Sequence, residues 1–142
     1  MKIQFDVDGH VPPKKDGANS MWNKTSEFDR LVRLRQEAVR ARGARDPLRR
    51  GITLRVEVYV PRPETRSAGD LDNFITGICD GLMAAHPRSA RDPRWNSPNL
   101  TAVHPDKIAA IADDSAVVSI VASKQQDPDG RTWYRVTLEG ES

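Results

Sequence analysis

Alternating apolar and polar residues predict four strands along the chain, because side chains in a strand point to opposite faces with a period of two. The clearest alternation covers residues 52–60, where every second side chain from Ile52 to Val60 is apolar. Weaker alternation marks residues 1–7, 116–123 and 132–138. Because Asp127-Pro128-Asp129-Gly130 is a strong turn signal, we expect the last two strands to pair as an antiparallel hairpin.

Apolar residues at helical spacing predict two helices. The first begins at Thr25 or Ser26, where Ser26 and Asp29 resemble a capping box, and stops at Gly43. Its face opposite the apolar stripe is mostly arginine. The second covers residues 69–83, with Asp72, Thr76 and Asp80 on one side and a continuous stripe on the other, formed by Leu71, Phe74, Ile75, Ile78, Cys79 and Leu82.

The segment between the second helix and the third strand is expected to be irregular. Residues 86–106 are rich in Pro, Arg, Asn and Ser, and Pro105 is expected to open a short helical turn that runs to Ile111. Trp95 either stacks on an unpaired base or packs against its own protein. His10, His86 and His104 are interpreted as plain loop residues rather than ligands.

These elements fit one domain over residues 1–142, with a loop insertion at about 84–112. The order strand, helix, strand, helix, strand, strand predicts an α/β (α+β) fold, in which two main helices cover a small mixed sheet of about four strands. The single cysteine excludes an internal disulfide, and we expect Cys79 in the core. No signal-peptide or membrane-span pattern is found, which favours a cytoplasmic protein.

The net charge is only +2, but basic residues are clustered. Arginines crowd residues 30–50, and a second set brackets an acidic segment: Arg62, Arg66, Arg88, Arg91 and Arg94. Such clusters suit a polyanionic substrate, and equally a solvated basic surface.

Two acidic segments are candidate metal ligands. Asp70 and Asp72 lie at the start of the second helix, and Asp113-Asp114 precede the third strand. Residues two apart in a helix diverge, so Asp70 and Asp72 can converge only if Asp70 has extended backbone at the helix entry. Mg²⁺ prefers oxygen ligands and is held by few carboxylates. The alternative is structural, with Asp70 as a helix cap and Asp113-Asp114 ending a turn.

Together these segments resemble the RusA family of Holliday junction resolvases. The resemblance rests on Asp70-Leu71-Asp72-Asn73, Asp80-Gly81-Leu82, Asp113-Asp114-Ser115-Ala116-Val117-Val118 and Lys124, and more weakly on Pro12-Pro13 followed by Asn19. It implies a homodimeric, Mg²⁺-dependent endodeoxyribonuclease (Mn²⁺ as a possible substitute) that resolves four-way DNA junctions by paired cuts. It also implies a bacterial or prophage origin.

Carried over by position, Asp70, Asp72 and Asp114 are the catalytic carboxylates, and Asp113 joins them as a metal ligand. Lys14, Lys15, Arg62, Arg66 and Lys124 are the expected DNA-binding cations. The family usually has a lysine where this chain has Thr76, and the link before Asp113 is usually shorter. Thr76 therefore leaves open a second function, a branched-DNA-binding protein with weak or no cleavage. A nuclease of the same chemistry for other DNA substrates also stays open, because the choice of a junction depends on dimer geometry and surface shape.

Overall fold

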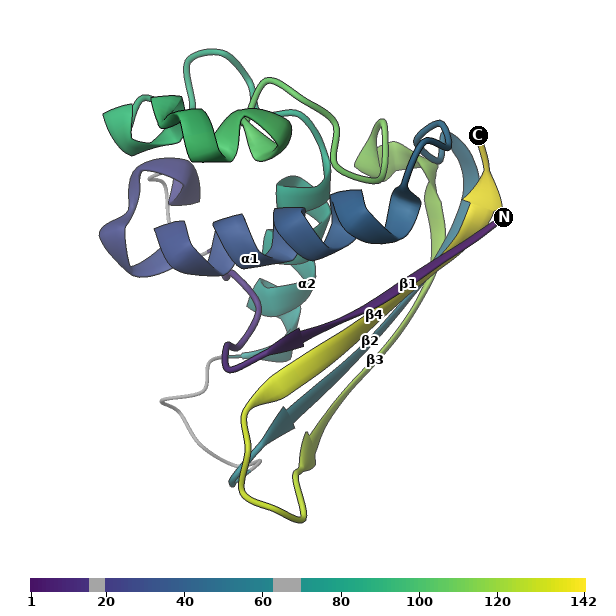
Figure 1. Cartoon of the computed structure of the whole chain (residues 1–142). Coiled ribbons are helices and arrows are strands. Elements are labelled where there is room, and N and C mark those ends of the chain that lie inside the picture. Colours follow the sequence, from purple (N-terminus) through teal and green to yellow (C-terminus); the bar gives the residue numbers. More distant parts are fainter. Residues whose placement is uncertain (16–19, 63–69) are drawn as a thin grey trace.

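The computed structural model describes residues 1–15, 20–62 and 70–142, and its centre is a four-stranded mixed sheet. The strands are β1 (Lys2–Asp8), β2 (Arg50–Val60), β3 (Val117–Gln126) and β4 (Trp133–Glu141), in the order β1-β4-β2-β3. β3 runs parallel to β2, and the other neighbours are antiparallel. Two helices, α1 (Thr25–Arg42) and α2 (Leu71–Leu82), cover one face of this sheet (Figure 1), which confirms the predicted fold class.

The predicted hairpin of the last two strands is wrong, because β2 lies between β3 and β4. The turn after β3 crosses the end of β2, where the Asp127 amide donates to the Val60 carbonyl at 2.8 Å. The Asp127 carboxylate accepts hydrogen bonds from the Trp133 indole and from the amides of Asp129 and Arg131. Turn residues specify that the chain reverses, but not which strand lies beside β3 in the sheet. β4 instead inserts between β1 and β2, where Tyr134, Val136 and Leu138 are fully buried.

The N-terminal cap of helix α1 differs from the prediction, whereas its C-terminal stop agrees with it. Lys24 occupies the N-cap position without a side-chain bond, and Ser26 Oγ donates to Glu27 Oε2 at 3.0 Å. The predicted capping box of Ser26 and Asp29 is therefore wrong. Glu27 is buried because it accepts the Lys14 amide at 2.8 Å, an interaction that fixes the preceding segment on the helix. The stop at Gly43 is confirmed, with φ at 63°.

One arginine of α1 points inward rather than to solvent. The Arg35 side chain is fully buried, and its five N–H groups donate to the carbonyls of Gly81, Met83, Val103, His104 and Lys107. Gly81 and Met83 lie at the C-terminal end of α2, where carbonyls lack helical partners and a cation is favoured. Arg35 thus fastens the end of α2 to the segment that follows it.

That following segment is more regular than expected. It contains the 3₁₀ helices η3 (Pro93–Asn96) and η4 (Pro98–Val103), because prolines suit the first position of each. The helical turn predicted from Pro105 to Ile111 is absent; Ile111 forms a bridge with Leu48 instead. The segment returns to α2, where the Leu82 carbonyl accepts the amides of residues 109–111.

Trp95 belongs to a second, smaller core. It is 1% exposed, and its ring lies 4.7 Å from that of Phe28 and 5.6 Å from that of Trp22. The Trp95 indole N–H donates to the Trp22 carbonyl at 3.0 Å. Trp22 lies in the short 3₁₀ helix η1 (Met21–Asn23) before α1. Of the two interpretations of Trp95, packing against its own protein is confirmed.

Candidate functional site

The DLDN segment opens α2 in the backbone geometry that convergence requires. Asp70 is the N-cap residue, with extended φ and ψ of −84° and 143°, and its side chain makes no capping hydrogen bond. Asp72 lies exposed in the first turn and accepts the Asn73 amide at 3.0 Å. The expectation of extended backbone at Asp70 is confirmed.

The second acidic segment lies at the other end of α2. Asp113 caps the 3₁₀ turn η5 (Asp114–Ala116) by accepting the Ser115 amide at 2.9 Å, so part of its expected structural role is real. The Asp114 amide contacts the Met83 sulfur at 3.0 Å, just beyond the helix C-terminus. Asp80 lies eight positions after Asp72 in α2, about 12 Å along the axis. Asp114 is therefore beside the Asp80 end rather than the Asp72 end.

The carboxylate of Asp114 lies near two other acidic side chains, Asp113 and Asp80. Partial burial raises the pKa of Asp114, and so do a hydrogen bond with Asp113 and the negative charges of Asp113 and Asp80. The pKa of Asp113 is lowered, chiefly because its carboxylate accepts the Ser115 amide. Asp80 thus joins the site, although the sequence marked it only as part of a motif. Its position on the same face as Asp72 was the available signal.

Beneath these carboxylates lies the single cysteine. Cys79 is 8% exposed, which confirms the expected core position. Burial raises the pKa of its thiol to about 11, with smaller contributions from the charges of Asp114 and Asp80. The thiol therefore stays protonated at neutral pH.

The predicted three-carboxylate group is not assembled within the residues that the structure describes. No three side chains among the His, Cys, Asp and Glu of residues 1–15, 20–62 and 70–142 are close enough to hold one ion together. Asp70 and Asp72 form one acidic pair, and Asp113 and Asp114 form the other, near Asp80. Each pair lies at one end of α2.

Two of the predicted cations approach α2 through a close backbone contact. Gly77 allows this approach, because a Cβ there would overlap the Pro13 carbonyl. The chain then runs along α2, where the Lys15 amide donates to the Asn73 carbonyl at 3.2 Å and Lys15 Nζ pairs with Asp80 at 2.9 Å. The Pro12-Pro13-Lys14-Lys15 segment therefore positions a cation beside the acidic residues of the helix.

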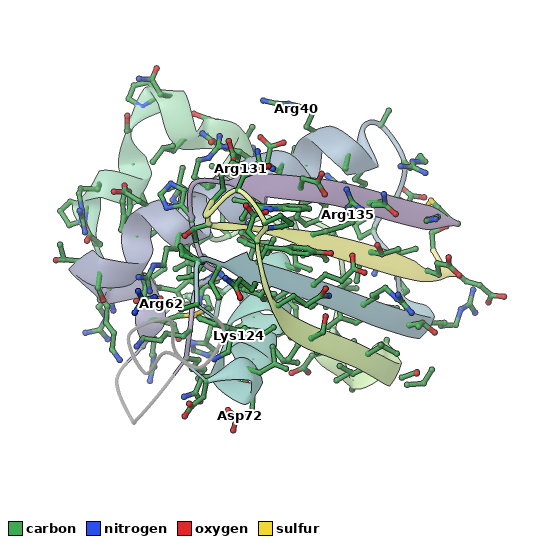
Figure 2. The ribbon with its side chains drawn as sticks, turned by 90° about the horizontal axis from the view of Figure 1, so that it is seen from below. Arg40, Arg62, Asp72, Lys124, Arg131 and Arg135 are labelled. Atoms are coloured by element: carbon green, nitrogen blue, oxygen red, sulfur yellow. The ribbon has the colours of Figure 1, made fainter. Side chains whose placement is uncertain are left out.

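Figure 2 locates the other predicted cations. Seen from below, Lys124 near the end of β3 and Arg62 just after β2 appear on the same side of the molecule as Asp72. Arg66 lies outside the described residues, as do Gly69 and Asn19 of the motifs. The Thr76 side chain donates its hydroxyl to the Asp72 carbonyl at 3.1 Å and brings no charge.

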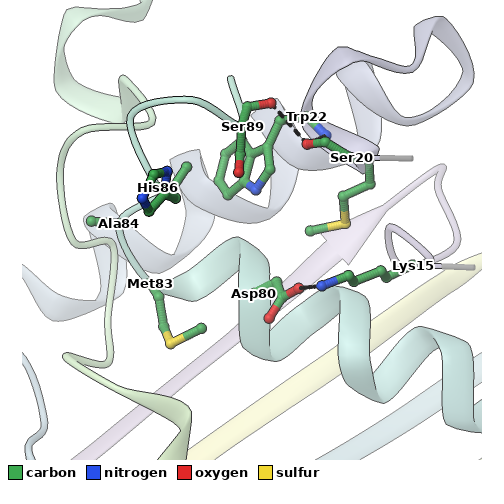
Figure 3. A pocket seen from close by; sticks show the side chains of 10 residues that line it. Lys15, Ser20, Trp22, Asp80, Met83, Ala84, His86 and Ser89 are labelled. Atoms are coloured by element: carbon green, nitrogen blue, oxygen red, sulfur yellow. Dashed lines mark hydrogen bonds and ion pairs between the residues drawn. The ribbon is translucent and has the colours of Figure 1, made fainter. Parts of the chain in front are cut away.

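A cavity of about 320 Å³ opens beside Asp80 (Figure 3). Its wall includes Lys15, Met83 and His86, together with Ser20, whose hydroxyl donates to the Ser89 carbonyl at 2.8 Å. Because Met83 also contacts Asp114, the cavity adjoins the Asp113-Asp114 turn. The sequence did not predict it, since residues 84–89 were expected only as part of a loop.

His86 and His104 have local hydrogen-bond partners. His86 Nδ1 accepts the Arg88 amide at 3.1 Å, and His104 Nδ1 lies 2.7 Å from Asp106.

No known protein-family model matches the chain, and no curated protein is significantly similar to it. None of the described helices is both long and apolar enough to cross a membrane.

Proposed function

We propose that this chain is a magnesium-dependent endodeoxyribonuclease that cuts branched DNA, with four-way junctions as the substrate that the resemblance to the RusA family favours. One observation carries the proposal. Carboxylates from two segments far apart in the sequence meet at the C-terminal end of α2, where Asp80 lies in the helix and the Asp114 amide contacts the Met83 sulfur at 3.0 Å. Lys15 Nζ pairs with Asp80 at 2.9 Å.

The donor set at this end of α2 fits magnesium by its chemistry. Crowded carboxylates carry negative charge that a divalent cation would neutralise, and oxygen is the ligand that Mg²⁺ prefers. Mg²⁺ is commonly held by one or two carboxylates together with waters and substrate phosphates. Asp114 and Asp113, or Asp114 and Asp80, would meet that need, and Asp70 with Asp72 form a second such pair. A bound ion would supply Lewis-acid activation of the phosphodiester.

The residues of the chain itself supply binding and positioning. Lys14, Lys15, Arg62 and Lys124 carry the positive charge that holds a DNA backbone, and such binding weakens steeply with salt. Lys15 is tied to Asp80, so DNA phosphate and Asp80 compete for the same ammonium group. The DNA strand would follow α2 between its two acidic ends, with its phosphates near Lys15.

A cleavage assay on a synthetic four-way junction, with and without Mg²⁺, tests this function. We expect cleavage only with the ion, and a loss of at least 100-fold in Asp114→Asn and in Asp72→Asn, with junction binding retained. Asp46→Asn is the matched control, because Asp46 lies exposed in the loop before β2, on none of the acidic segments. Wild-type rates in both Asp114→Asn and Asp72→Asn would exclude the proposed site.

A second function, binding of branched DNA with little cleavage, is favoured by Thr76. Its hydroxyl is engaged with the helix backbone and offers no cation for the phosphate or leaving group. If this function is correct, the native chain binds junctions tightly but cuts them slowly, and Thr76→Lys increases the cutting rate. Brisk cutting by the native chain would rule it out.

A further inference from the structure

The cavity beside Asp80 has walls that hydrogen bonds hold in place. The last turn of α2 lies on one side of it, and η1 and the loop that follows α2 form the facing side (Figure 3). Ser20 Oγ and Asn23 Nδ2 both donate to the Ser89 carbonyl at 2.8 Å. The Asn23 side-chain oxygen accepts the Arg91 amide at 2.6 Å. The cavity is therefore preformed, and its volume of about 320 Å³ suits one small ligand.

The lining of this cavity is partly apolar and carries a pair of opposite charges at one edge. Met21 and Trp22 contribute apolar surface and are only 1% and 5% exposed. At the charged edge, Lys15 Nζ lies 2.9 Å from Asp80 Oδ2, and the two side chains are 45% and 20% exposed. An ion pair as exposed as this contributes little to stability, so a ligand can bind both partners at low cost. Apolar walls with polar groups at one edge are typical of pockets for an unpaired nucleobase.

We propose that this cavity binds an unpaired guanine base. The Asp80 carboxylate has two oxygens that only accept hydrogen bonds, and it accepts the N1–H and N2–H donors of guanine, one on each oxygen. The Lys15 ammonium group, held next to Oδ2, then donates to guanine O6, which is adjacent to N1. Adenine, cytosine and thymine each present a single nitrogen donor on this edge, so they engage only one carboxylate oxygen. The charged edge therefore selects guanine.

A guanine at a branch point of DNA is the source that we infer, a step that rests on the proposed function. In duplex DNA the N1–H and N2–H donors are occupied by cytosine, whereas an unpaired base costs least to move into a pocket. Met83 lines the cavity and its sulfur contacts the Asp114 amide at 3.0 Å, so the base lies near the acidic turn. Arg88 and Arg91 flank Ser89 in the wall loop and carry positive charge for the adjoining phosphates.

Isothermal titration calorimetry of the full chain without metal tests the cavity directly. The probes are dGMP, dAMP, dCMP and dTMP, a hairpin DNA with one bulged guanine, and the same hairpin without the bulge. We expect dGMP to bind about tenfold more tightly than the other nucleotides, and the bulged hairpin to bind more tightly than dGMP or the intact hairpin. Equal binding of the four nucleotides would overturn the proposal. A preference for dGMP without any preference for the bulge would support the cavity and overturn DNA as the source of the base.

Asp80→Asn provides a test by exchange of partners. The amide keeps one acceptor but places a donor opposite the N2–H donor of guanine, and that donor matches the carbonyl that xanthine has at this position. The variant should bind dGMP about tenfold less tightly, and deoxyxanthosine monophosphate more tightly, than the native chain. Gain of the xanthine nucleotide also shows that the variant is folded. Asp46→Asn, at an exposed position in the loop before β2, is the control and should bind dGMP like the native chain. Unchanged dGMP binding by Asp80→Asn would refute the assignment.

A second variant narrows the cavity and leaves the ion pair in place. Ala84 is exposed and lines the cavity, so Ala84→Phe should abolish the preference for dGMP. Ala102→Phe is the matched control, because Ala102 is an exposed alanine of η4 and is not part of the cavity lining. Circular dichroism checks that both variants are folded. Equal binding of dGMP by the two variants would contradict this location.

None of these measurements involves DNA cleavage, so the two proposals fail separately. Selective binding of guanine by a chain that never cuts junctions refutes the nuclease function and leaves the cavity standing. Junction cleavage by a chain that binds all four nucleotides equally refutes the cavity and leaves the nuclease function.

Discussion

Replacing Arg35 with methionine tests whether one buried guanidinium holds the end of α2 to the residues that follow. The change keeps a side chain of similar length but removes all five donors, so that five carbonyls each lose their hydrogen bond to Arg35. Hydrogen bonds from a charged donor contribute about 1.5 kcal/mol each at the low end. Against them stands the cost of burying the charge, which lowers the pKa of Arg35 to about 10 from 12.5. That shift corresponds to roughly 3 kcal/mol.

The balance predicts a loss of about 4 kcal/mol in the free energy of unfolding, within the range for breaking a buried charged network. For a domain of this size, that lowers Tm by about 10 °C or more. Urea and thermal unfolding followed by circular dichroism measure it. Arg40→Met on the same helix is the control, because the Arg40 side chain is 75% exposed and pairs with Glu37 on the helix surface. Limited proteolysis should find new cleavage within residues 84–112. A loss below 1 kcal/mol, equal to that of the control, would refute the role of Arg35.

Three further predictions concern the core and the site. The Tyr134 hydroxyl is buried with no hydrogen-bond partner in the described part of the chain. Tyr134→Phe should therefore raise the free energy of unfolding in urea by about 1 kcal/mol. A less stable variant would contradict this. Gly77→Ala should lower the free energy of unfolding by about 3 kcal/mol and weaken junction binding, because the added methyl group overlaps the Pro13 carbonyl. Thr76→Ala, at an exposed position of the same helix, is the control. Equal Tm values for the two variants would disprove the contact. Asp114→Asn should raise Tm at neutral pH. The pKa of Asp114 in the folded state lies above its value in the unfolded state, so the native chain loses stability when pH rises above the folded pKa. The difference in Tm between the variant and the native chain should therefore disappear as pH falls below the unfolded pKa. A higher Tm of the variant that persists at low pH would contradict this explanation.

Hydrophobic periodicity predicted the strands and helices because each of them buries one face. The alternation from Ile52 to Val60 and the stripe from Leu71 to Leu82 correspond to β2 and α2 in the structure. Strand order was not predictable in the same way. Alternation states which face of β4 is buried but not which strand lies beside it, and the turn at Asp127-Pro128-Asp129-Gly130 serves a crossover as well as a hairpin.

The candidate site was predicted only in part, for a similar reason. Local sequence determined the extended backbone at Asp70 and the cap at Asp113, because both depend on neighbouring residues. Which end of α2 meets Asp114 depends on how residues 84–112 return to the sheet. That path follows from Arg35, whose burial could not be inferred from its place among exposed arginines.

The buried thiol of Cys79 can be used to measure local unfolding around α2 in the native chain. A disulfide reagent modifies thiolates, so it reaches Cys79 only when α2 separates from its neighbours, and the labelling rate in mild conditions measures how often that happens. Slower labelling with added magnesium would indicate that the ion stabilises the packing of α2 even in the absence of DNA.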